Sequence, residues 1–86
     1  MPEICRFFDI LIYMYFNEHP PAHFHVKHNE FRAQIAIATL EIIDGQLPPK
    51  QLRMVKQWAK AHQEELMKNW LSLQETGNFD KIMPLK

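Results

Sequence analysis

The chain has 86 residues, of which 47% are hydrophobic and 12% are aromatic. This length predicts one domain, residues 1–86, with a single modest core. The aromatic content argues against a wholly disordered chain. Ten basic residues balance ten acidic ones, so the composition argues against a strongly basic nucleic-acid binder. Zero net charge and a high aromatic content both favour association with other chains. We therefore expect a permanent partner or a homo-oligomer.

Cys5 is the single cysteine, so no disulfide can form within the chain. The sequence shows no secretory signal and no apolar run of about 18 residues. We therefore expect a cytoplasmic protein that does not enter a membrane. The apolar segment around Cys5 indicates a small buried side chain rather than a reactive thiol.

Residues 4–16, ICRFFDILIYMYF, are rich in the β-branched and aromatic side chains that favour strands. Asp9 indicates a turn between a short first strand and a longer second one. Alternation along the second strand predicts a buried face and an opposite face. The buried face carries Ile10, Ile12, Met14 and Phe16. The opposite face carries Leu11, Tyr13, Tyr15 and Asn17. Pro20 and Pro21 then end the strand, because proline cannot donate to a ladder.

Residues 23–37, HFHVKHNEFRAQIAI, predict a β-hairpin whose loop is Asn29-Glu30. The predicted register pairs apolar residues on one face and polar residues on the other, and this agreement on both faces favours it. The mostly apolar face pairs His28 with Phe31, Val26 with Ala33, and Phe24 with Ile35. The polar face pairs Lys27 with Arg32 and His25 with Gln34.

Residues 40–43, LEII, predict a last strand that Asp44 and Gly45 close. Pro48 and Pro49 suit the start of a helix, and neither proline nor glycine interrupts residues 50–75. Within them a stripe recurs at steps of three and four residues, as in a helix. The stripe consists of Leu52, Val55, Ala59, His62, Leu66, Trp70 and Leu73. A break near His62 would divide the segment into two helices. The apolar residues in 78–86 indicate that this tail docks.

The apolar face of the sheet needs a cover, and the helical stripe supplies one. We therefore predict an α+β fold. A small antiparallel sheet of three to five strands, residues ~4–43, packs on one long or two shorter C-terminal helices, residues ~49–75.

The second face of the sheet gathers side chains that carry protons or bind anions. They are Tyr13, Tyr15, His23, His25, Lys27, Arg32 and Gln34, with His19 joining from the adjacent loop. We expect this face to be exposed, since an antiparallel sheet commonly has one solvated face. Three interpretations of it remain open.

The first interpretation is a metal site. His23 and His25 project to the same side of a strand, and His19 supplies a third ligand. Imidazole suits zinc, copper, nickel or iron. Apart from Glu18, however, no acidic residue with ligand spacing accompanies them, and strand-borne His-x-His pairs often occur without a metal. We therefore expect no cofactor, with a transition metal such as zinc as the alternative.

The second interpretation is an RNA-cleaving site. Cleavage of RNA needs a general base, a general acid and a cation for the charged transition state. The catalytic candidates are His23, His25, Tyr13, Tyr15 and Arg32. The substrate-binding candidates are Lys27, Gln34 and His19. A histidine-triad motif does not fit, because the third histidine, His28, falls on the opposite strand face.

The third interpretation is a polar sheet face without catalysis. Its histidines would bond to their neighbours or contact another protein chain. Polar side chains are expected on an open antiparallel face in any case.

The segments IYMYFNEH, PPAHFHV, EFRAQI, DGQLP and VKQWAKAHQEELMKNW follow one another in an order that resembles domain-of-unknown-function family 4160, a family of small bacterial proteins. The resemblance runs from about Ile4 to Trp70, and its most specific part is the proline-His-Phe-His-Val block. Ala22 stands where the family usually has its second proline, and Asn29 replaces a common hairpin glycine.

The family is similar to the DhiT-type toxins of type II toxin–antitoxin modules. The resemblance therefore implies a toxin that a small antitoxin protein from an adjacent gene neutralises by direct contact. It supplies no catalytic residue, so whether the protein is an enzyme stays open. Our leading hypothesis is a toxin-like protein that acts on RNA. The rival is a non-enzymatic module that binds a protein or a metal through the His-x-His face.

Overall fold

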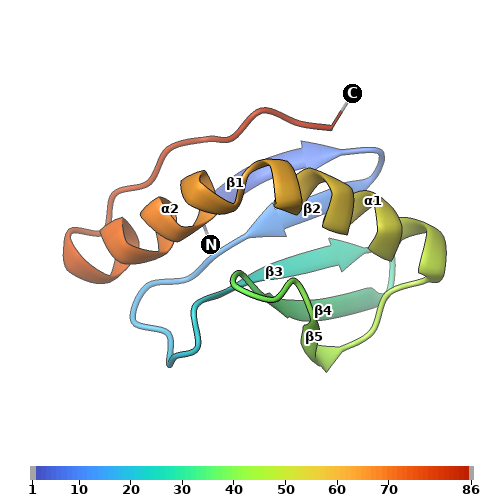
Figure 1. Ribbon diagram of the computed structural model, residues 1–86, viewed down its shortest axis with the longest axis horizontal. Coiled ribbons are helices and arrows are strands. Elements are labelled where there is room, and N and C mark those ends of the chain that lie inside the picture. Colours follow the sequence, from blue (N-terminus) through green and yellow to red (C-terminus); the bar gives the residue numbers. More distant parts are fainter. Residues whose placement is uncertain (1, 86) are drawn as a thin grey trace.

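The computed structural model describes residues 2–85 of the chain. Five strands form one antiparallel sheet in the order in which they follow along the chain. They are β1 (Glu3–Phe7), β2 (Ile10–Tyr13), β3 (His23–His28), β4 (Phe31–Ala36) and β5 (Ile42–Gly45). Two helices follow, α1 (Pro49–Ala61) and α2 (Gln63–Glu75), and both lie on the same side of the sheet (Figure 1). The predicted α+β fold is confirmed, with two helices rather than one.

The two tight hairpins occur where the sequence indicates turns. Phe8 and Asp9 join β1 to β2 with φ angles of 44° and 61°. Asn29, with a φ of 53°, begins the loop between β3 and β4. All predicted pairs between β3 and β4 are confirmed, from His28 opposite Phe31 to Phe24 opposite Ile35. The polar face of β3 therefore carries His23, His25 and Lys27.

The second strand is shorter than predicted, and this changes the position of Phe16. Strand β2 ends at Tyr13, and the backbone N–H of Met14 donates to the carbonyl oxygen of Pro2 at 3.1 Å. Asn17 then takes a φ of 53°, which turns the chain out of the strand direction. The prediction that Phe16 belongs to the buried face is wrong, because half of this residue is exposed.

The last strand begins two residues later than predicted and includes Asp44 and Gly45 instead of ending before them. Leu40 takes a φ of 61° and belongs to the preceding turn. Gly45 has a φ of 78°, and a Cβ atom there would lie only 2.1 Å from the carbonyl oxygen of Arg32. Glycine is thus required where β5 meets β4, and Asp44 pairs with Gln34 beside it.

The core lies between the sheet and the helices, as the two apolar patterns predict. Its fully buried side chains include Ile10, Ile12, Phe24, Val26 and Ile35 from the sheet, with Val55, Trp58 and Leu66 from the helices. The helices meet at His62, whose φ of −123° is outside the helical range. The C-terminal tail docks, as predicted. Within residues 2–85, no helix is long and apolar enough to span a bilayer.

The docked tail lies on the outer side of β1, which is the first edge strand of the sheet (Figure 1). The backbone N–H of Ile82 donates to the carbonyl oxygen of Ile4 at 3.1 Å. The indole N–H of Trp58 donates to the carbonyl oxygen of Met83 at 2.7 Å. Asn69 bonds both the carbonyl oxygen and the N–H of Asp80, at 2.8 and 2.9 Å. These bonds satisfy buried polar groups that would otherwise destabilise the fold.

Candidate functional site

A row of polar and aromatic side chains crosses the sheet on the face away from the apolar core. Tyr13 of β2 lies directly opposite His25 of β3, which lies opposite Gln34 of β4, and Gln34 lies opposite Asp44 of β5. Neighbouring strands place such pairs about 5 Å apart. The predicted β3–β4 register places His25 beside Gln34, and the β2–β3 and β4–β5 pairings, which the sequence did not predict, add Tyr13 and Asp44.

This face is less exposed than the sequence predicts. The exposed fractions of His23, His25 and Tyr13 are only 4%, 9% and 6%, so the expected solvent-exposed surface is wrong for these three residues. The cause is the chain that connects β2 to β3, which folds back over the strands. It places the Tyr15 ring 4.9 Å from the His25 ring, centroid to centroid. Alternation within strands does not encode such a loop.

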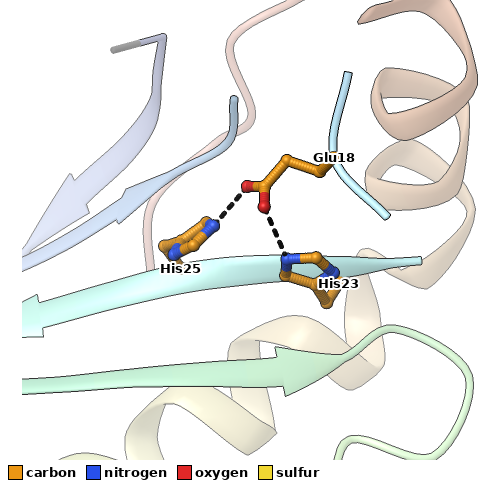
Figure 2. A group of neighbouring side chains, drawn as sticks. All are labelled: Glu18, His23 and His25. Atoms are coloured by element: carbon orange, nitrogen blue, oxygen red, sulfur yellow. Dashed lines mark hydrogen bonds and ion pairs between the residues drawn. The ribbon is translucent and has the colours of Figure 1, made fainter. Parts of the chain in front are cut away.

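Glu18 lies in the same connection and joins the two histidines (Figure 2). Its Oε2 lies 3.2 Å from Nε2 of His23, and its Oε1 is in even closer contact with Nε2 of His25. The side chains of His23, His25 and Glu18 are 5%, 11% and 20% exposed. One carboxylate therefore faces two imidazoles in a largely dry environment.

The tautomer of His23 follows from its second contact. Nδ1 of His23 lies 2.8 Å from the carbonyl oxygen of Pro21. A carbonyl oxygen can only accept, so Nδ1 carries the hydrogen and donates it. In the neutral ring, Nε2 is then a bare acceptor that faces another acceptor, the Glu18 carboxylate. A positive charge between these two atoms, either a proton or a metal cation, would turn their repulsion into attraction.

Aromatic rings hold both imidazoles in position. The Tyr13 ring is stacked on His25, with centroids 5.0 Å apart and planes 16° apart. The indole of Trp70, from α2, lies 5.1 Å from the His23 ring. Burial raises the pKa of Tyr13, and its neighbours Tyr15 and Glu18 raise it further while Arg32 lowers it. The Tyr13 phenol is therefore protonated at neutral pH and can donate a hydrogen bond.

A pocket of about 210 Å³ opens on the other side of His25. Its lining includes Tyr13, His25, Arg32 and Gln34, four of the residues that the sequence singles out. Ala33, Asp44 and Gly45 complete the lining, and none of these three is among the site residues that the sequence predicts. The predicted last strand, residues 40–43, ends before Asp44, whereas β5 includes Asp44 and Gly45. This difference in the strand boundary explains why Asp44 and Gly45 were not predicted for the site.

Not all of the predicted site residues join this arrangement. His19 is exposed and contributes no atom to the cluster of ligand atoms, in which Glu18, one residue earlier, stands instead. Lys27 lies opposite Arg32 in the next row of the sheet and lines a separate hollow with Arg6 and Asp9. Tyr15 reaches the site and stays 41% exposed. One feature of the sequence indicates Glu18 as a site residue, namely its position a few residues before the paired histidines.

The match to known families includes every residue of the site. Residues 9–71 match the family described as Domain of unknown function (DUF4160). The chain belongs to the DUF4160 family. The matched residues include the whole range from Tyr13 to Gly45 and also Trp70, whereas the docked tail lies outside the match. No curated protein and no solved structure shows a significant match. The function of this DUF4160 chain must therefore be inferred from its own residues.

Proposed function

We propose that this DUF4160 protein is the toxin-like component of a bacterial type II toxin–antitoxin module and that it acts on RNA. The supporting observation is the pocket beside His25, because Tyr13, His25, Arg32 and Gln34 all line it. These are groups that transfer protons or bind anions, and phosphodiester cleavage requires both kinds. Arg32, His25 and Tyr15 each have a separate proposed task.

Arg32 is the proposed phosphate-binding group. Its side chain is exposed at the pocket, and among residues 2–85 no carboxylate lies within ion-pair distance of its guanidinium. A guanidinium binds phosphate oxygens with two parallel hydrogen bonds. Lys27, directly across the strands from Arg32, adds a second positive charge beside it. Arg32 and Lys27 thus place two positive charges side by side, while one carboxylate, that of Asp44, also lines the pocket.

His25 is the proposed proton-transfer group. The Glu18 carboxylate contacts its Nε2, an arrangement that fixes the orientation of the ring. Nδ1 of His25 has no hydrogen-bond partner within residues 2–85 and is not among the fully buried unpaired atoms. It is therefore free to exchange a proton with a substrate in the pocket. Histidine is suited to this task near neutral pH.

Tyr15 is the proposed contact for a base. Its ring packs edge-on against both Tyr13 and His25 and keeps 41% of its surface exposed. Proteins that bind unpaired RNA commonly stack bases on such rings. This contact favours single-stranded RNA over a duplex.

The antitoxin is proposed to act by covering this face. The pocket lies on the sheet face opposite the one that packs on α1 and α2, since Tyr13, His25 and Gln34 alternate with core residues. A small protein bound there would bury Arg32 and Tyr15 and block entry of RNA. Neutralisation would then need direct contact and no chemical change.

Induced expression in bacteria tests the proposal, with growth and total RNA on a gel as readouts. We expect the wild type to slow growth and to fragment RNA, and Arg32→Ala to abolish both effects. Arg32 is exposed, so its removal should not prevent folding. Arg53→Ala, an exposed arginine of α1, is the matched control and should stay as toxic as the wild type.

Two outcomes would contradict the proposal. A wild type that leaves growth unchanged at a verified protein level removes the basis for a toxin. An Arg32→Ala variant as toxic as the wild type shows that the pocket is not the site. His25→Ala, compared with His19→Ala, tests the proton-transfer role in the same assay.

A further inference from the structure

Three ligand atoms of different residues converge (Figure 2), and one of these residues, His25, also lines the pocket. A carboxylate oxygen of Glu18 and one ring nitrogen each of His23 and His25 lie within 4.8 Å of one another. Two imidazoles and one carboxylate form a ligand set typical of catalytic zinc and of non-haem iron. We propose that Glu18, His23 and His25 bind a divalent transition-metal ion.

The hydrogen bond of His23 to the backbone supports a ligand role. Metal-binding histidines nearly always donate their other ring N–H to a carbonyl or carboxylate, which aims the remaining lone pair at the metal. His23 does so through Nδ1, 2.8 Å from the Pro21 carbonyl oxygen. Its Nε2 lone pair therefore points at the Glu18 carboxylate. A cation between them would accept both lone pairs and remove their repulsion.

The distances suit a small cation. Zinc binds nitrogen at about 2.0–2.1 Å and carboxylate oxygen at about 2.0–2.2 Å, which separates tetrahedral ligand atoms by about 3.4 Å. Oε2 of Glu18 and Nε2 of His23 are 3.2 Å apart, so this pair needs almost no movement. The closer pair, Glu18 and His25, must open, and the two histidine nitrogens, which lie within 4.8 Å of each other, must take up the same spacing. Glu18 can provide this movement, because it lies in a connection and not in a strand.

The site is also rigid enough to favour binding. Both histidines stand on one strand, β3, and the Tyr13 and Trp70 rings pack against them. These two histidines have little conformational entropy left to lose when a metal binds, which increases affinity. Three protein ligands leave a fourth tetrahedral position open for water or substrate.

Metal binding would also connect the cluster to the pocket. His25 as a ligand through Nε2 carries its hydrogen on Nδ1, and it would then donate to a phosphate oxygen rather than accept a proton. Metal binding does not depend on the action on RNA, because it is measured on the protein alone. The alternative is that a shared proton, rather than a metal, lies between Glu18 and the histidines. In that case the protein would not bind a metal tightly.

Titration calorimetry tests the site, with ZnCl₂ added to the full-length, tag-free protein after treatment with a chelator. We expect one zinc ion per chain with micromolar or tighter affinity. Zinc should also raise the midpoint of thermal unfolding by several degrees, since a ligand that binds only the native state stabilises it. Glu18→Gln and His23→Ala should each weaken binding by at least about tenfold.

The controls are His19→Ala and His28→Ala, two histidines that lie outside the cluster of ligand atoms, and both should bind zinc within about twofold of the wild type. Glu18→Gln keeps the size of a partly exposed side chain, so it should fold even if His23→Ala does not. Circular dichroism checks the fold of each variant. A wild type that does not bind zinc, or a folded Glu18→Gln variant that binds it equally well, would overturn the proposal.

Discussion

The phenol ring of Tyr13 is stacked on the imidazole ring of His25, with their planes 16° apart. The two residues face each other directly in the β2–β3 ladder, so the strand register itself determines the stack. One face of the His25 ring is thereby shielded, and its edges are left for Glu18 on one side and the pocket on the other. The stack also buries the Tyr13 phenol.

Tyr13 should therefore ionise at higher pH in the folded protein than in the unfolded chain. Burial, the largest cause, raises its pKa above the ordinary value of 10.0. The chain has only two tyrosines, so Tyr15→Phe leaves Tyr13 alone to be titrated by its ultraviolet absorbance. The folded variant should titrate later than the same variant in urea.

The same shift makes stability depend on pH in the alkaline range. Because the folded pKa of Tyr13 is raised, its contribution is fully present below pH 10.0 and is lost as pH rises through the folded pKa. The urea midpoint of Tyr15→Phe should fall more steeply above pH 10.0 than that of the double variant Tyr13→Phe/Tyr15→Phe. Equal slopes would contradict a buried phenol.

Cys5 should react slowly with thiol reagents in the folded state. The residue is 4% exposed, and burial, as the largest cause, raises the pKa of its thiol, which lowers the fraction of reactive thiolate. As the chain has one cysteine, the rate of alkylation reports on this residue alone. We expect reaction to speed up sharply across the urea unfolding transition. A folded rate equal to the unfolded rate would show that Cys5 is accessible.

Gly45→Ala should destabilise the protein more than Gly77→Ala. The two glycines have nearly equal φ angles, 78° and 79°, so the backbone cost of alanine is similar at both. At Gly45 the new Cβ would lie 2.1 Å from a backbone oxygen, whereas at Gly77 it would lie 3.3 Å from the side-chain ring of Phe16. We expect a loss of about 2 kcal/mol or more for Gly45→Ala, measured by urea unfolding. A smaller loss at Gly45 than at Gly77 would contradict the β4–β5 register.

Ile82→Ala should cost about 2–4 kcal/mol of unfolding free energy, because it removes a buried side chain and leaves a cavity. Ile82 is 5% exposed, whereas its neighbour Met83 is 61% exposed. Met83→Ala is therefore the matched control and should change stability by about 0.5 kcal/mol or less. If both changes are equally small, the tail does not dock on β1.

The sequence predicts the sheet better than it predicts the site. The β3–β4 register follows from two alternating faces, and a slip by one residue would expose Phe24, Val26 and Ile35 together. The helical segment also follows from the stripe, although the sequence left one long helix and two shorter ones as alternatives, and the structure decides for two. These features depend on local periodicity, which is visible in one sequence.

The connection between β2 and β3 has no periodicity, and most of the misplaced or missed residues lie in it, apart from Asp44 and Gly45 of β5. Phe16 leaves the sheet because the chain turns at Asn17. Glu18 reaches both histidines only because the connection folds over β3, and His19, which the sequence favours as a ligand, is exposed and outside the cluster. Contacts between residues five and seven positions apart in an irregular segment depend on tertiary packing rather than on pattern.

Glu18 faces a bare Nε2 of His23 in the neutral ring, and we propose that a cation belongs between them. Nitrogen-15 NMR of the histidine rings tests it directly, because the shifts of Nδ1 and Nε2 report which nitrogen carries hydrogen or metal. We expect His23 to carry hydrogen on Nδ1, and added zinc to shift Nε2 of His23 and His25 while leaving His28 unchanged. A neutral His23 with its hydrogen on Nε2, unaltered by zinc, would contradict the account.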